Sequence, residues 1–226
     1  MNAAAAAPPL APRAAYALWA PSYEAETAIS FVDDRLVAAL TPPLAGLRLL
    51  DAGCGTGRRL RAVDGAALAA GADLTWEMLA LGPEPRPFAA ADVRALPFAA
   101  ARFDVVWCRL VVGHLPDPAP AYAELGRVCA PGGTVVVTDF HPDAAAAGHT
   151  RSFRDAAGTL HDVEHHLHSV DAHLSAAAAA GLTLVERRDG VIGDALKPFY
   201  ARVGRLDRYT ADEGLAVVLA LSFRRE

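Results

Sequence analysis

The feature that most constrains the fold of this chain is the stretch LLDAGCGTG at residues 49–57. An apolar run ends in an acid, Asp51, and is followed at once by Gly53, Gly55 and Gly57. Glycine adopts positive φ and has no side chain to hold a ligand away from the backbone. In open α/β sheets, ligands bind at the carboxyl ends of the strands, where such turns lie. The stretch therefore predicts a buried parallel strand that leads into a ligand-binding turn.

The alternation of apolar runs and helical patterns predicts a doubly wound, Rossmann-like α/β fold. Strands that alternate with helices pair in parallel and carry helices on both faces of the sheet. We expect a seven-stranded, mostly parallel sheet whose last strand is antiparallel and inserted between two neighbours, and a hairpin cap after the fifth strand. The expected strands cover residues 47–51, 67–72, 87–90, 103–107, 133–139, 182–187 and 217–224, and the expected helices 16–40, 75–81, 118–128 and 170–180.

Composition suggests one domain behind a short lead. Residues 1–15 are rich in alanine and proline and are expected to be disordered, whereas a chain with 53% hydrophobic residues can bury one core over 16–226. The cap element is expected at about 141–170. The amino terminus lacks the pattern of a signal peptide, and no clean apolar run is long enough to span a bilayer.

Charge and cysteine content exclude several classes of partner. The net charge of −5 argues against a nucleic-acid partner, since phosphate neutralisation needs a basic face. The three cysteines have no metal-ligand spacing and fit a reducing cytoplasm. The arginines of residues 58–61 are expected on a solvated helix end. We therefore expect a cytoplasmic monomer or homodimer with no metal, nucleic-acid or membrane partner.

Two ligands compete for the glycine turn. The pyrophosphate of a dinucleotide such as NAD requires a G-x-G-x-x-G turn, whereas this chain has G-x-G-x-G. Asp51 would repel a pyrophosphate but attract the ammonium and sulfonium groups of S-adenosylmethionine. Asp73 follows the second strand, where a carboxylate can accept both ribose hydroxyls. Charge therefore favours S-adenosylmethionine.

The chain resembles the class I S-adenosylmethionine-dependent methyltransferases, in particular the small-molecule group with an LDxGCGTG motif. The resemblance covers residues 16–140 well and the remainder loosely. It implies methyl transfer to a small organic acceptor at oxygen, nitrogen or carbon, with S-adenosylhomocysteine as the other product. Five segments match in order and spacing, at residues 49–57, 71–79, 90–98, 102–118 and 125–140.

The resemblance implies a set of donor-binding residues. The three glycines pass under the methionine and ribose, Asp73 binds the ribose hydroxyls and Asp92 faces the adenine amine. The segment YALWAPSYE at residues 16–24 is similar to the YDxWAxxYD segment that covers the donor, although an aromatic stripe also fits a core helix. The remaining residues that it implies are Tyr16, Trp19, Tyr23, Asp51, Leu74, Met78, Val93, Cys108 and Arg109.

Histidines are the candidates for a general base. His114, in GHLPDP, resembles the HxxDP segment of the family and comes first, followed by His141 or His166. In a strand over residues 159–168, alternation would place His166 on the face opposite His165. The alternatives are a loop-capping side chain for His114 and a polar hairpin face for the others. A zinc site is disfavoured because no cysteine joins the histidines and no H-E-x-x-H is present.

Two other functions stay open at this point. One is a nicotinamide oxidoreductase built on a similar sheet, which the position of Asp51 and the glycine spacing disfavour. The other is a catalytically silent subunit that binds S-adenosylmethionine for regulation or assembly. The acceptor, the methylated atom and the pathway do not follow from the residues.

Overall fold

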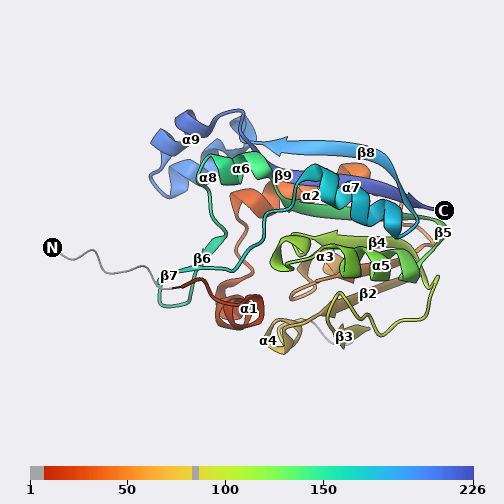
Figure 1. Cartoon of the computed structure of the whole chain (residues 1–226). Coiled ribbons are helices and arrows are strands. Elements are labelled where there is room, and N and C mark those ends of the chain that lie inside the picture. The colour runs from red at the N-terminus through yellow and green to blue at the C-terminus, as the bar shows by residue number, and fades with distance from the viewer. Residues whose placement is uncertain (1–7, 83–86) are drawn as a thin grey trace.

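The computed structural model describes residues 8–82 and 87–226, and one seven-stranded sheet lies at its centre (Figure 1). The strand order is β3-β2-β1-β4-β5-β9-β8. Strands β1 to β5 pair in parallel, and β9 is antiparallel to both of its neighbours, β5 and β8. This confirms the predicted sheet with an inserted antiparallel last strand. The strands are β1 Arg48–Ala52, β2 Leu68–Asp73, β3 Phe88–Ala90, β4 Phe103–Arg109, β5 Cys129–Phe140, β8 Leu182–Val191 and β9 Ala216–Arg225.

Helices cover both faces of this sheet, with α5 and α7 in front of it and α2 behind it in Figure 1. The longer helices are α1 Pro12–Trp19, α2 Ala28–Leu40, α5 Ala119–Val128, α7 Val170–Ala179 and α9 Leu206–Asp212. The short ones are η1 Ala20–Ser22, α3 Arg58–Arg61, α4 Trp76–Leu79, η2 Val112–His114, α6 Pro142–Ala146, η3 Asp194–Leu196 and α8 Lys197–Arg202. Helix α3 has only four residues. Among the described helices, none has both the length and the apolar character needed to cross a membrane.

Strand β4 shows how the sheet builds two cores. Its side chains alternate, so that Val106 and Cys108 join the cluster under α5 and α7, while Val105 and Trp107 join the cluster under α2. All four are buried, because a central parallel strand is covered on both faces. The fully buried Tyr122 extends the first cluster. The core therefore fixes the carboxyl end of β4, where the site lies.

The amino-terminal segment differs from its prediction. Residues 1–7 of the expected disordered lead lie outside the described residues, but for 8–15 the prediction is wrong, because Leu10 pairs with Val163 and α1 begins at Pro12. Leu10 exchanges two backbone hydrogen bonds of 2.8 Å with the chain on either side of Val163. The expected helix over 16–40 is also broken after residue 22, and α2 starts anew at the Thr27 capping box. The pairing of Leu10 depends on a partner far along the chain, whereas the capping box at Thr27 is local.

The predicted hairpin is present after β5, and its strands are β6 Ser152–Arg154 and β7 Leu160–Asp162. Asp155 closes its turn by accepting the amides of Ala157 and Thr159, each at 2.9 Å. The strand expected through residue 168 ends at Asp162, so the predicted alternation of histidines is wrong. Residues 163–169, here called the strap, instead run irregularly from the hairpin to α7. The strap lies over η2, which follows β4.

Candidate functional site

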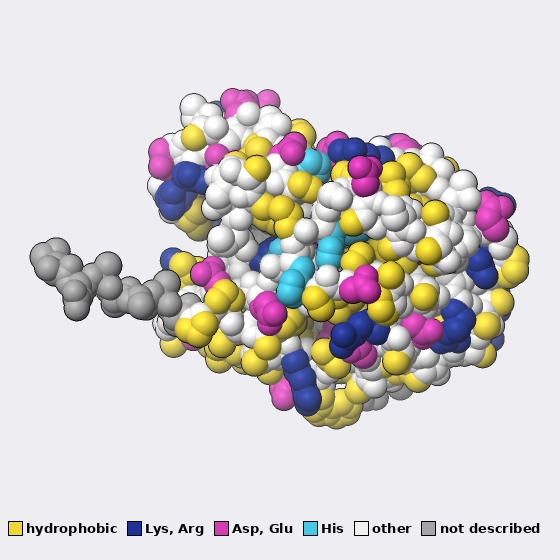
Figure 2. Space-filling model, viewed as in Figure 1, with side chains coloured by type: hydrophobic (Ala, Val, Ile, Leu, Met, Phe, Trp, Pro, Cys, Tyr) yellow, Lys and Arg dark blue, Asp and Glu magenta, His cyan; other side chains and the backbone are white. Residues whose placement is uncertain are grey.

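A cavity of about 1040 Å³ opens at the carboxyl ends of β1, β2 and β4. Helix α1, the hairpin and the strap form its other walls. Figure 2 shows this face hollowed beside a group of histidine side chains. Its lining includes Tyr16, Trp19, Tyr23, Gly53, Gly55, Asp73, Leu74, Met78, Asp92, Val93, Arg109, His114 and His166, all of which the sequence predicts as site residues.

The glycine turn presents its backbone to this cavity. Gly53 and Gly55 have φ values of 90° and 57°, in the left-handed region that favours glycine. A Cβ on Gly55 would lie 3.1 Å from Met78 Cε and 3.5 Å from the Tyr23 ring, so a side chain here would crowd two residues of the cavity wall. The result is a cradle whose floor is peptide backbone.

Asp73 ties the cradle to β2. Its Oδ2 accepts the Gly55 amide at 2.8 Å, and its Oδ1 accepts the Thr75 amide at 2.8 Å. Burial raises the pKa of Asp73, although these amides act in the opposite direction. Asp73 therefore orders the turn and also faces the cavity.

Asp92, which follows β3, lies on the same side of the cavity. Arg94 Nη2 donates a hydrogen bond to the Asp92 carboxylate at 2.6 Å, and hydrogen bonds from Arg94 lower the pKa of Asp92. Val93 beside it is buried, whereas Leu74 is 47% exposed at the cavity wall. Asp92 is therefore an ionised carboxylate next to apolar surface.

Asp51, a predicted ligand contact, is buried just outside the cavity lining. It is 1% exposed, and its Oδ1 has no hydrogen-bond partner among the described residues. Burial raises the pKa of Asp51 to about 6, against the opposing effect of Arg109. A buried carboxyl oxygen without a partner is costly, and a donor or cation bound at the turn would relieve that cost.

Two further predicted ligand contacts, Gly57 and Cys108, do not line the cavity. Gly57 is the amino-terminal cap of α3 and packs against the Phe88 ring, so it does not line the cavity. Cys108 points into the core under α5 and is fully buried, which raises the pKa of its thiol. Strand alternation explains Cys108, because its neighbour Arg109 takes the opposite face.

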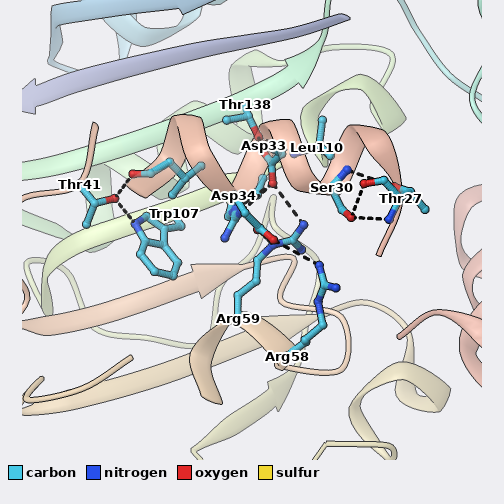
Figure 3. A network of polar contacts seen from close by, with 12 residues as sticks. Thr27, Ser30, Asp33, Asp34, Thr41, Arg58, Arg59, Trp107, Leu110 and Thr138 are labelled. Atoms are coloured by element: carbon cyan, nitrogen blue, oxygen red, sulfur yellow. Dashed lines mark hydrogen bonds and ion pairs between the residues drawn. The ribbon is translucent and has the colours of Figure 1, made fainter. Parts of the chain in front are cut away.

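Arg109 lines the cavity but belongs to a buried ion network that the sequence did not predict. Figure 3 labels its members Asp33, Asp34 and Arg59. Asp33 of α2 accepts Arg109 Nη2 at 2.7 Å, Arg59 Nη2 at 3.2 Å and the Thr138 hydroxyl at 2.6 Å. Asp34 also contacts both arginines. Burial alone would raise the pKa of Asp34, but Arg59 and Arg109 lower it. Arg59, expected on a solvated helix end, is instead held behind the glycine turn.

The predicted aromatic segment serves as core and cavity wall at once. Trp19 stacks on Phe153 of the hairpin, with ring centroids 4.9 Å apart, and meets Tyr23 edge-on at 5.0 Å. Tyr16 stacks on Trp19 at 5.7 Å. These contacts join α1 to the hairpin over the cavity.

His114 is held from both sides of its ring. Its Nδ1 lies 3.1 Å from the carbonyl oxygen of Glu164 in the strap, and its Nε2 lies 3.0 Å from Tyr16 Oη. Because a carbonyl can only accept, Nδ1 carries the proton and Nε2 accepts from the Tyr16 hydroxyl. Burial, followed by the charge of Arg151, lowers the pKa of His114 to about 4. His114 is therefore a neutral imidazole at neutral pH.

The two other candidate bases lie apart from each other. His141 does not reach the cavity lining, because it is buried as the amino-terminal cap of α6, where its Nδ1 accepts the Asp143 amide at 3.1 Å. His166 does line the cavity, and its Nε2 lies 3.4 Å from a Glu164 carboxylate oxygen. His141 is thus a structural cap, whereas His166 keeps a position at the site.

Sequence reasoning missed a buried carboxylate beneath the strap. Asp139, at the end of β5, lies 3.6 Å from His165 Nε2 and 3.4 Å from His173 Nε2. Burial would raise the pKa of Asp139, but the two imidazoles lower it below its usual range. Tyr122 is hydrogen-bonded to the other nitrogen of His173 at 3.0 Å. A histidine-rich segment after a strand that ends in an acid was the available sequence signal for this cluster.

No cluster of metal-ligating side chains occurs in residues 8–82 and 87–226.

Known proteins are similar to this chain in sequence and in fold. Residues 50–137 match the model of a methyltransferase domain family. A crystal structure of an S-adenosylmethionine-dependent methyltransferase from Mesorhizobium loti is 25% identical, covers 86% of this chain and 98% of that one, and superposes with a TM-score of 0.68. Residues 50–137 are therefore similar to this methyltransferase domain family, and the fold around them is that of S-adenosylmethionine-dependent methyltransferases. A second methyltransferase structure, from Listeria monocytogenes, has a TM-score of 0.70 at 16% identity and covers 87% of this chain and 97% of that one.

Curated methyltransferases match the same part of this chain. A demethylmenaquinone methyltransferase of Renibacterium salmoninarum is 39% identical over 113 residues, which are 48% of this chain and 48% of that protein. A malonyl-[acyl-carrier protein] O-methyltransferase of Pseudescherichia vulneris is 35% identical over 129 residues, 55% of this chain and 51% of that protein. The chain therefore spans about half the length of the curated relatives it matches.

Proposed function

We propose that this chain binds S-adenosylmethionine at the glycine turn and methylates a small organic molecule at oxygen, nitrogen or carbon. The observation that carries the proposal is the pairing of a bare backbone cradle with acids of three successive strand ends. Gly53 and Gly55 line the cavity without side chains, and Asp73 and Asp92 face the same cavity. These groups suit a phosphate-free ligand with ribose hydroxyls and an adenine amine.

The buried Asp51 is the part of the site that most favours a cationic ligand. Its Oδ1 has no partner among the described residues, and its pKa is raised to about 6. An ammonium group bound near the turn would favour the ionised form of this carboxyl. A pyrophosphate there would face Asp51 and Asp73 together and be repelled. The carboxylates of Asp51 and Asp73 therefore fit S-adenosylmethionine better than a dinucleotide.

S-adenosylmethionine, when bound, supplies a methyl group on a sulfonium sulfur that is already activated for displacement. The residues of this chain then have to position the acceptor and remove a proton where the acceptor carries one. Tyr16 and His114 lie at the cavity wall, and the Nε2 atom of His114 can hold a proton delivered through the Tyr16 hydroxyl. The low pKa of His114 makes it a weak base, so we expect positioning to contribute most of the acceleration.

Binding of S-adenosylhomocysteine tests the donor site without knowledge of the acceptor. Isothermal titration calorimetry should give a dissociation constant below the millimolar range for the unmodified protein. Asp73→Ala should weaken binding at least tenfold, since it removes an acceptor of ribose hydroxyls and an anchor of the turn. Asp207→Ala, at an exposed position of α9, is the matched control and should bind as the unmodified protein does. An S-adenosylhomocysteine titration without heat at millimolar ligand would count against the proposal.

A catalytically silent subunit that binds S-adenosylmethionine is the second reading. It would bind S-adenosylhomocysteine tightly and transfer no label from methyl-labelled donor to any component of a metabolite extract. The open cavity beside Tyr16 and His114 favours the enzyme, because a silent subunit needs no space there. A nicotinamide oxidoreductase is the less favoured reading, and enhancement of NADH fluorescence on mixing would revive it.

The remaining expectations about the whole protein are part of this proposal. We propose that the chain from α1, which begins at Pro12, to residue 226 acts as one domain with a cap at about 141–170, and that the protein is a cytoplasmic monomer or homodimer without a nucleic-acid partner. Three free, buried cysteines fit a reducing compartment. The net charge of −5 disfavours binding to a polyanion.

A further inference from the structure

Arg151 is a cation of the cavity wall that lacks a carboxylate partner. No acidic side chain of residues 8–82 and 87–226 lies within ion-pair distance of its guanidinium, although Asp and Glu partners hold most arginines around the glycine turn. Its Nη2 reaches the Tyr16 hydroxyl oxygen at 3.3 Å. Its carbonyl accepts the Val163 amide at 2.8 Å, which fixes the start of the hairpin. A half-buried guanidinium with one long hydrogen bond retains donors for a ligand.

The acidic side chains near Arg151, Asp155 and Glu164, lie beside histidines instead of Arg151. Asp155 binds His161 Nε2 at 2.8 Å and also accepts two backbone amides of its turn. The Glu164 side chain is 50% exposed and lies beside His166. Arg13 of α1, on the same side of the cavity, likewise has no ion-pair partner within the described chain. The cap end of the cavity therefore carries unpaired positive charge.

The opposite end of the cavity carries both signs of charge, since Arg58, Arg59 and Arg94 lie there with the acids. Asp73 and Asp92 lie there, beside the glycine turn. Between the two ends, the wall is apolar and includes Leu110, Leu115 and Phe140. A ligand that fills the cap end would thus place an anionic group on a cation and an apolar body against these side chains.

We infer that the methyl acceptor is an organic acid with an apolar body, and that Arg151 binds its carboxylate beside the Tyr16–His114 pair. The inference rests on the proposed function. A guanidinium binds a carboxylate through two parallel hydrogen bonds, so Arg151 selects both charge and planar geometry. Arg151 is a specificity-determining residue for the acceptor.

A carboxylate at Arg151 has a second possible source, the methionyl end of the methyl donor. Arg58 follows the glycine turn directly, lines the cavity and is held by Asp34 only through a 3.4 Å contact. Arg58 therefore offers the donor its own cation, whereas Arg151 belongs to the hairpin on the cap side. This division assigns Arg151 to the acceptor.

Calorimetry on the S-adenosylhomocysteine complex tests the assignment with matched pairs of probes. Benzoate, phenylacetate and hexanoate are titrated alongside benzamide, phenylacetamide and hexanamide. We expect at least one carboxylate to bind ten times more tightly than its amide. Arg151→Gln should reduce that preference to less than twofold, and Arg151→Lys should retain part of it. Arg188→Gln, which removes an exposed cation from β8, should keep the full preference.

A second comparison separates the two sources of carboxylate. The affinities of Arg151→Gln for S-adenosylhomocysteine and for 5′-methylthioadenosine, which lacks the methionyl carboxylate, should both stay within twofold of the unmodified protein. A tenfold loss confined to S-adenosylhomocysteine would assign Arg151 to the donor and overturn the inference. It is also overturned if no carboxylate is preferred to its amide, or if the preference survives in Arg151→Gln. Absence of S-adenosylhomocysteine binding by the unmodified protein is a separate outcome, which rejects the proposed function itself.

Discussion

Asp51 and His114 are both buried beside the cavity, and burial moves their pKa values in opposite directions. The pKa of Asp51 rises to about 6, so its ionised form is destabilised in the fold. The pKa of His114 falls to about 4, so its protonated form is destabilised. Asp51 therefore lowers the free energy of unfolding as pH rises, whereas His114 lowers it as pH falls. Such opposed shifts at one site are typical of functional positions, where stability is given up for binding or chemistry.

Replacement of Asp51 by Asn should stabilise the free protein at alkaline pH. Because the folded pKa lies above the unfolded value, ionisation of Asp51 costs stability progressively as pH rises through about 6. We expect Asp51→Asn to raise the free energy of unfolding at pH 8 by about 1–3 kcal/mol and to have a smaller effect at pH 4. Urea denaturation at both pH values measures this. Calorimetry should show weaker S-adenosylhomocysteine binding by the same variant, and a variant that is less stable at pH 8 would contradict the account.

His114 should make the protein less stable in mild acid. Its folded pKa is about 4, so the contribution of the neutral ring is present above the unfolded value of about 6.5 and is lost as pH falls toward 4. Between pH 7.5 and 5.0, this loss amounts to about 2 kcal/mol. Urea denaturation of the unmodified protein and of His114→Asn at these two pH values should show that the variant loses less. Equal losses in the two proteins would be inconsistent with a buried neutral imidazole.

At the scale of elements, the strap is the segment whose position depends most on distant partners. Within the strap, Glu164 holds the His114 ring, the His166 amide donates to the Gly113 carbonyl at 2.6 Å, and His168 Nε2 lies 2.9 Å from the Leu115 carbonyl. These contacts dock the strap on η2, so the strap sets the protonation pattern of His114.

Gly113→Ala should displace the strap. A Cβ at this position would collide with His165 Nε2 and Asp139 Oδ1, and neither the buried carboxylate nor the packed ring has room to yield. We expect a loss of about 1–3 kcal/mol in unfolding free energy and faster proteolysis between residues 163 and 169. Gly193→Ala is the matched control, because nothing lies within 4 Å of a Cβ there and its φ is −137°. Protection of the strap equal to that of the unmodified protein would refute this contact.

The elements that sequence could predict are those that local patterns determine. The apolar runs of β1, β4 and β9 predict buried strands without any knowledge of distant contacts. The glycine pattern after β1 likewise predicts a ligand-binding turn. The pairing of Leu10 with Val163 depends on a contact across the chain, which periodicity cannot encode. The same limit applies to Arg151, because an unpaired arginine is recognised only when its neighbours are known.

At the scale of the whole molecule, the buried ion network joins the amino-terminal segment to the sheet. Asp33 of α2 meets Arg109 of β4, Arg59 of α3 and Thr138 of β5, so four elements share one carboxylate. The glycine turn lies between β1 and α3, and it is therefore braced by a helix that precedes it by some twenty residues. Removal of one partner would leave buried charge uncompensated.

Asp33→Asn should destabilise the whole molecule. The change leaves the guanidinium groups of Arg109 and Arg59 with one fewer buried carboxylate, and we expect a loss of about 3–5 kcal/mol in unfolding free energy. Asp207→Asn, which breaks an exposed 3.5 Å contact with Arg205, should cost at most about 0.5 kcal/mol. Both values follow from urea denaturation at pH 7.5. Equal effects of the two substitutions would show that the network contributes no more than a surface pair.

The most direct test of the central claim is a crystal structure of the protein soaked with S-adenosylhomocysteine. The account predicts electron density for the adenosyl thioether across the turn at Gly53 and Gly55, with the ribose hydroxyls at Asp73 and the adenine beside Asp92. Density at another surface, or a turn that stays empty at saturating ligand and accepts a diphosphate instead, would contradict it.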